Sequence, residues 1–309
     1  MMVDESILIL AYEFDEKPSE ELKNNIQQKS IELYKLFRSQ KHLKLCDSFW
    51  DSNACIILIL ELLNKNNILE SDVCDLFTEI EERLRHEILY FETSSLQNYI
   101  YYFYLYLIRF EQKITKENLD FILVIQAIER IAEHLENNNF SLYNNDVSGM
   151  IYILHLINCL DYFSDYIKKI LDSVLQKISK QRSLSTKLNE IYLSNLFIAY
   201  KINELYNWNY EINWLDAVYE FLPNFRVDIE YNSISFRKLY FLNTLLHKPN
   251  DKIIKSFFRN LENEIKSKSI DDQLCNAIFG LGGIRLSIKT HKKMVSSSWT
   301  EILLLPEIL

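Results

Sequence analysis

Glycine and proline are scarce in this chain of 309 residues, which contains four of each. Average usage would supply roughly 22 glycines and 15 prolines. A β-sandwich, a barrel or a nucleotide-binding α/β sheet of this length needs many of these residues at its turns. Long helices joined by short polar connections do not, because a helix interior disfavours both residue types. The composition therefore predicts an all-α protein.

An excess of positive charge and closely spaced cysteine pairs are also missing. The chain has 34 Lys and Arg residues against 43 Asp and Glu residues, so its net charge is −9. A negative chain is a poor general binder of nucleic acid backbones. Four of the five cysteines lie inside apolar stretches and none forms a CxxC pair, which favours buried thiols in a reducing cytoplasm. The five are Cys46, Cys55, Cys74, Cys159 and Cys275.

The chain has neither a long apolar run nor a secretory signal. Acidic residues follow the first methionines, where a signal peptide would carry basic ones. The most apolar stretch, 99–108, is short of the ~18 residues that a membrane span requires. We therefore expect a cytoplasmic protein without a membrane span.

Two kinds of helical segment alternate along the chain. In the first kind, apolar residues recur every three or four positions, as one buried helix face requires. These segments are 19–37, 72–89, 117–135, 164–178, 214–222 and 252–265. The second kind is apolar on nearly all sides, which predicts helices buried on all sides. Its examples are 56–63, 99–108, 150–157 and 236–246.

A short polar or small-residue turn is expected before each buried helix. The turns are 51–55, 94–98, 146–149, 189–192, 232–235 and 280–283, and successive turns end 43 to 51 residues apart. This spacing indicates a helix-pair repeat of about 45 residues. Such repeats either close into an α/α toroid, here of six or seven helical hairpins, or form an open superhelix. No linker divides the chain, so we expect one toroid domain over 1–309.

All four glycines lie at these turns, at Gly149, Gly280, Gly282 and Gly283. In a chain so poor in glycine, this placement favours positions that need a positive φ or a close approach of another segment. The alternative is a helix cap or tight turn with no ligand nearby.

The sequence around these glycines resembles a known family. Residues 280–288 (GLGGIRLSI) resemble the Gly-Leu-Ala-Gly-Ile-x-Leu-x-Leu signature of lanthionine synthetase C-like proteins, the cyclases of lanthipeptide biosynthesis. Residues 299–305 (WTEILLL) resemble the closing Trp-x-x-x-Leu-Leu-Leu of many members. Residues 149–154 are similar to an internal copy, and 52–58 keep its frame without the glycines. The resemblance implies an α/α toroid that takes part in the maturation of ribosomally made peptides.

Catalytic members of that family hold zinc through two cysteines and one histidine, in a Trp-Cys-x-Gly turn and a Cys-His-Gly turn. The zinc deprotonates a substrate thiol for attack on a dehydroamino acid. This chain reads Glu230-Tyr231-Asn232 at the first place and Cys275-Asn276-Ala277 at the second. We therefore expect no zinc, no other cofactor and no cyclase chemistry. The chain would bind or present a modified peptide or a leader peptide, with a dehydratase-type protein as a further partner.

The sequence still contains one candidate metal site. His155 and Cys159 are four residues apart on an apolar helix and share a face, and Cys275 could add a third ligand. The alternative is a hydrogen-bonded core histidine beside a buried thiol. The other histidines stand in polar surroundings and are predicted at the surface, namely His42, His86, His134, His247 and His291.

Two further features admit other functions. The tyrosines of 99–106 fall on every side of one helix, where they either surround a peptide-binding cavity or fill the core. The repeat pattern also suits an α-solenoid interaction scaffold unrelated to peptide maturation. A toroid enzyme acting on sugars would need paired carboxylates, for which Asp146, Glu190 and Glu230 lie at repeat turns.

Overall fold

The computed structural model describes the chain in segments, each of which is helical or connects helices. The described residues are 10–11, 14, 17–39, 53–65, 81–82, 84–86, 88–90, 96–110, 114, 118–136, 140–144, 146–180, 188–227, 235–267 and 281–305. No strand occurs among them, so the predicted all-α class is confirmed for this part of the chain.

The α-helices are α2 (Glu20–Ser39), α3 (Asn53–Lys65), α5 (Leu96–Phe110), α6 (Leu119–Glu136), α7 (Val147–Asn158), α8 (Ser164–Lys180), α9 (Glu190–Leu205), α10 (Trp214–Phe221), α11 (Phe236–Thr244), α12 (Lys252–Ser267) and α13 (Leu281–His291). Short 3-10 helices are η3 (Leu222–Asn224), η4 (Leu245–His247) and η6 (Ser298–Leu303).

The two sequence patterns correspond to two environments. In α12 the buried side chains are Ile254, Phe258, Leu261 and Ile265, which form one face of the helix. In α7 the buried residues run without a break from Val147 to Leu154, so that helix is enclosed on all sides over two turns. The segments 150–157 and 252–265 were therefore interpreted correctly from their periodicity. Residues 72–80 of the predicted segment 72–89 lie outside the described residues.

The predicted turns 146–149 and 189–192 include the first residues of α7 and α9, whereas Ser235, the described residue of 232–235, precedes α11 as predicted. The side chain of Asn189 accepts a hydrogen bond from the Tyr192 amide at 2.8 Å, and α9 begins at the next residue. Ser235 accepts in the same way from the Lys238 amide at 3.3 Å at the start of α11. Short polar side chains stabilise a helix start because they satisfy its exposed amides. The small polar clusters mark where helices begin.

The buried helices follow one another in space and run in the same direction. Contacts join α3 to α5, α5 to α7, α7 to α9, α9 to α11 and α11 to α13. Near the beginnings of α7 and α9, the Ser148 amide donates to Asn195 Oδ1 at 3.1 Å. Near their ends, His155 Nδ1 lies 3.2 Å from Tyr206 Oη. These partners are 47 and 51 residues apart, as expected for equivalent positions in successive repeats.

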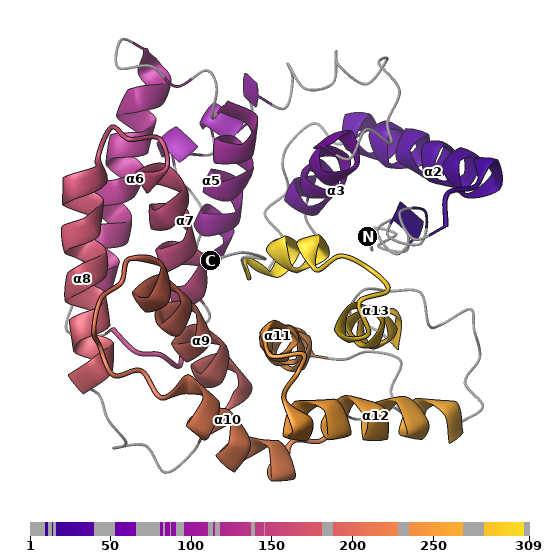
Figure 1. Ribbon diagram of the computed structural model, residues 1–309. Coiled ribbons are helices and arrows are strands. Elements are labelled where there is room, and N and C mark those ends of the chain that lie inside the picture. Colours follow the sequence, from indigo (N-terminus) through magenta and orange to yellow (C-terminus); the bar gives the residue numbers. More distant parts are fainter. Residues whose placement is uncertain are drawn as a thin grey trace.

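The amphipathic helices pack against this inner series from outside. Contacts join α2 to α3, α6 and α8 to α7, α10 to α9 and α12 to α13. Figure 1 shows α2, α6, α8, α10 and α12 along the outer edge of the molecule and the apolar helices closer to its middle. No helix in the described part of the chain is long and apolar enough to cross a membrane.

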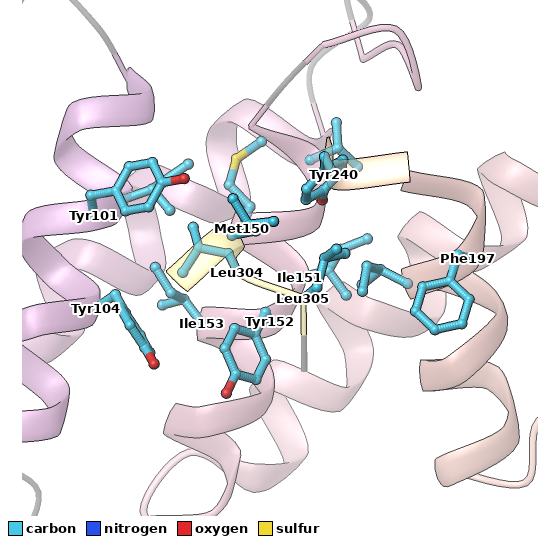
Figure 2. Close-up of a cluster of buried hydrophobic side chains, with 14 of the residues drawn as sticks. Tyr101, Tyr104, Met150, Ile151, Tyr152, Ile153, Phe197, Tyr240, Leu304 and Leu305 are labelled. Carbon is cyan, nitrogen blue, oxygen red and sulfur yellow. The ribbon is translucent and has the colours of Figure 1, made fainter. Parts of the chain in front are cut away.

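The C-terminal segment returns from α13 to the middle of the molecule, where Figure 1 shows it in yellow. Trp299 is fully buried and its Nε1 donates to Thr290 Oγ1 of α13 at 3.0 Å. Leu303, Leu304 and Leu305 are buried as well. Figure 2 shows Leu304 and Leu305 in one apolar cluster with side chains of α5 and α7. The chain thus places its own leucines among its central helices.

Candidate functional site

The end of α7 brings together the histidine and the thiol that the sequence singled out, and the end of α9 adds a tyrosine. Cys159 follows the last residue of α7, and its Sγ lies 4.0 Å from His155 Nε2. The other ring nitrogen of His155 faces Tyr206 Oη at 3.2 Å. Burial lowers the pKa of His155, so the imidazole is neutral at pH 7. Burial raises the pKa of the Tyr206 phenol to about 12.

The thiol of Cys159 is exposed, which corrects the expectation of a buried one. The reason is that α7 ends at Asn158 and the chain turns there, with Asp161 in the left-handed region at φ 59°. Cys46, Cys74 and Cys275, of which Cys275 is the predicted third ligand, lie outside the described residues. Cys55 lies in α3.

The histidines predicted at the surface differ in their exposure. His86 is exposed as expected. His247, at the end of η4, is largely buried, with its ring centroid 4.7 Å from that of Phe197, so the surface prediction was wrong for it. Burial and the nearby Lys201 and Lys248 lower its pKa to about 4. The sequence did not reveal this because packing against α9 buries the ring.

Of the remaining histidines, His134 and His291 are half-buried. The ring of His291 stacks on Phe258, with centroids 4.3 Å apart. His42 lies outside the described residues.

The first turns of α7, α9 and α11 meet in a buried polar cluster, made of Ser148, Asn195 and Tyr240. Asn195 accepts from the Ser148 amide and donates to the carbonyls of Leu142 and Asn144 at 2.8 and 2.7 Å. The Tyr240 hydroxyl donates to Ser148 Oγ. These bonds align three neighbouring helix starts. Tyr143 and Tyr192 lie half-buried at the same end, with ring centroids 5.1 Å apart.

Two of the three carboxylates predicted at repeat turns lie at the beginnings of neighbouring helices. Asp146 precedes α7 without capping it through its side chain, and burial raises its pKa. Glu190 begins α9, where its carbonyl accepts from the Ser194 hydroxyl at 2.8 Å. Glu230 lies outside the described residues.

A buried carboxyl that the sequence reasoning missed lies in α3. Glu61 is 5% exposed, and its Oε1 is 3.9 Å from Arg109 Nε, which also pairs with Glu81 at 2.8 Å. Burial raises the pKa of Glu61 to about 7, against the lowering effect of Arg109. The signal was available, because Glu61 is the one acid inside the apolar run of 56–63. A carboxyl with a pKa near neutrality can take up and release a proton at physiological pH.

At Gly149, other segments of the chain approach the backbone too closely for a larger side chain. A Cβ on Gly149 would lie 2.8 Å from Ile100 Cγ2 and 2.8 Å from Leu304 Cδ1. Gly282 and Gly283 lie within α13, and no described glycine has a positive φ, so that part of the expectation was wrong. Gly280 lies outside the described residues. Gly149 therefore marks the place where α5 and the C-terminal segment both touch α7.

The tyrosines of α5 belong to the core. All aromatic side chains from Tyr99 to Tyr106 are buried. Tyr106 Oη donates to Asp120 Oδ1 at 2.6 Å, and Tyr104 Oη to Glu301 Oε2 at 3.3 Å. Burial of these side chains, together with the bonded hydroxyls of Tyr104 and Tyr106, favours the structural interpretation over a peptide cavity.

No group of three or more His, Cys, Asp or Glu residues that could hold a metal ion occurs in the described part. No family model, curated protein or solved structure matches the chain.

Proposed function

We propose that this chain is a lanthionine synthetase C-like α/α toroid that binds or presents a ribosomally made peptide without zinc-dependent cyclisation. One observation carries the proposal. Two segments that resemble the family's motifs, 149–154 and 299–305, contact each other between Gly149 and Leu304. They are far apart in the chain, so their contact is what one shared architecture would produce.

The toroid is supported by the order and direction of the inner helices. Each contacts the next from α3 to α13, and α7 and α9 pair beginning with beginning and end with end. The C-terminal segment bonds to both α13 and α5, through Trp299 and Glu301. We infer that the series closes, with α13 beside the helices that precede α5.

The proposed peptide surface is the end where α7 and α9 begin. Tyr143 and Tyr192 are half-buried there and offer aromatic faces to apolar peptide side chains. Helix N-termini also favour acidic groups through their dipoles and exposed amides. The central leucines occupy the interior, so a peptide would lie across this end. A dehydratase-type protein is the proposed further partner.

Peptide binding is tested with a Ser-, Thr- and Cys-rich precursor peptide, should a neighbouring gene encode one, in its unmodified and dehydrated forms. Fluorescence anisotropy should show saturable binding that the Tyr192→Ala variant weakens at least tenfold. Tyr166→Ala, on the exposed side of α8, is the matched control and should bind as the wild type does. Equal affinity of all three proteins would overturn the proposed surface.

The absence of cyclase chemistry is tested separately. The purified chain should carry no stoichiometric zinc and leave a dehydrated peptide linear. Retention of zinc together with ring formation would overturn the proposal. Absence of any precursor or dehydratase gene nearby, combined with no peptide binding, would favour the interaction scaffold.

Closure of the ring is tested by a distance between its two ends. Spin labels at the exposed Ile31 of α2 and the exposed Met294 after α13 should give one short, narrow distance distribution. An open superhelix would hold these positions far apart.

A further inference from the structure

The thiol and imidazole at the end of α7 form a two-atom site that the proposed peptide function does not use. Residues four apart lie on the same helix face, one turn above the other. Here the spacing brings Cys159 Sγ to 4.0 Å from His155 Nε2 on the surface of the molecule. The thiol is exposed and the imidazole is half-buried beneath it.

The second nitrogen of His155 is held by the neighbouring helix. Its Nδ1 lies 3.2 Å from Tyr206 Oη, and the two rings meet edge to face with centroids 6.1 Å apart. Tyr206 in turn stacks on Trp208, with centroids 4.9 Å apart. Histidines that bind metals nearly always use the second ring nitrogen for such an oxygen contact, which fixes the ring and its tautomer. In the tautomer in which Nδ1 donates to Tyr206 Oη, the Nε2 lone pair faces the thiol.

The protonation state of His155 separates two uses of this pair. A nucleophilic cysteine relies on a charged imidazolium that stabilises the thiolate. Burial opposes that charge on His155 and lowers its pKa. A neutral imidazole is the form that binds a metal ion.

The separation of the two atoms suits an ion placed between them. Bonds to zinc of about 2.3 Å from sulfur and about 2.0 Å from nitrogen put the two ligand atoms about 3.5 Å apart at a tetrahedral angle and about 4.3 Å apart in line. The observed 4.0 Å lies between these limits and corresponds to a wide angle at the metal. Among the described residues no third ligand joins this pair, whereas zinc sites take at least three protein ligands. A thiolate favours soft copper(I), an ion that accepts two ligands nearly in line.

We propose that Cys159 and His155 together bind one copper(I) ion, with Tyr206 as the positioning residue. Binding forms one Cu–S and one Cu–N bond and releases the thiol proton to solvent. Copper enters as copper(I), so the step needs no oxidant or reductant. The proposal is independent of peptide binding.

The test is anaerobic titration of the full chain with copper(I) in competition with a chromophoric copper(I) chelator. A variant with serine at Cys46, Cys55, Cys74 and Cys275 leaves only the proposed thiol and should bind one equivalent. X-ray absorption of that complex should show one sulfur and one nitrogen neighbour. Absence of binding, or a metal bound without nitrogen, would overturn the proposal.

Three substitutions in that background assign the ligands. Cys159→Ser and His155→Gln should each abolish the competitive binding, and Tyr206→Phe should weaken it about tenfold or more, as loss of an orienting partner does. His86→Gln, at an exposed histidine, is the matched control and should retain the full affinity. Circular dichroism identifies any variant that fails to fold. Because Cys159 is exposed, its substitution preserves the fold, and unchanged binding by Cys159→Ser would refute the site by itself.

Discussion

At the residue scale, a buried carboxyl and a buried imidazole respond to pH in opposite directions. The pKa of Glu61 is raised to about 7, so the folded state holds its proton at pH values where the unfolded chain has released it. Stability from this group is therefore complete below the unfolded value of 4.5 and falls as the pH rises toward 7.

We expect Glu61→Gln to remove this loss of stability at rising pH. The variant should match the wild type near pH 4.5 and exceed its free energy of unfolding above pH 7, by at most ~3 kcal/mol. Urea denaturation between these pH values measures the difference. Glu82→Gln, at an exposed position, is the control, and parallel pH profiles for Glu61→Gln and the wild type would contradict the prediction.

His247 behaves in the reverse way. Its pKa is lowered to about 4, so its contribution to stability is complete above pH 6.5 and falls as the pH drops toward 4. We expect His247→Gln to reduce the acid sensitivity of the free energy of unfolding in that range by up to ~3 kcal/mol. The exposed His86→Gln should leave it unchanged. Acid titrations followed by urea denaturation distinguish the two.

At the element scale, the contact of three segments at Gly149 limits which side chains α7 can carry. Alanine there would place a Cβ 2.8 Å from methyl groups of Ile100 and Leu304. Overpacking of this kind costs about 1–3 kcal/mol, while the better helix propensity of alanine returns about 1 kcal/mol. We expect Gly149→Ala to lower the free energy of unfolding.

A double-mutant cycle tests the cause. In the Leu304→Ala background, Gly149→Ala should cost about 1 kcal/mol less than in the wild type, because one of the two close methyl groups is gone. Additive effects of the two substitutions would mean that the C-terminal segment does not press on α7.

At the scale of the whole molecule, the C-terminal leucines join helices from both halves of the chain. Leu305 is fully buried, and its carbonyl accepts from the Thr300 hydroxyl at 3.0 Å. We expect Leu305→Ala to cost about 2–5 kcal/mol, as other buried leucine truncations do. Hydrogen exchange should accelerate in both α5 and α13, because the segment bonds to each.

Leu119→Ala is the control for that experiment, since Leu119 is 51% exposed. It should change neither the stability nor the exchange of α5 and α13 by a measurable amount. Acceleration confined to α13 would show that the segment stabilises its own end of the chain alone.

Most of the helical framework could be predicted from the sequence. Helix periodicity is a local property, so 164–178 and 252–265 identified α8 and α12 to within two residues at each end. The spacing of the polar clusters also anticipated contacts between residues 47 and 51 positions apart. The turns 146–149 and 189–192 were misread as separate from α7 and α9 because capping residues and turn residues are the same types.

What the amino-acid order determined, then, is the set of helices, their apolar faces and their repeat length, since each depends on residues a few positions apart. Tertiary packing alone decided that His247 is buried, that Glu61 lies beside Arg109 and that Leu304 meets Gly149. It also placed Tyr206 against His155. Each of these contacts joins different segments, and the burial that shifts a pKa or excludes a side chain exists only once those segments have packed together.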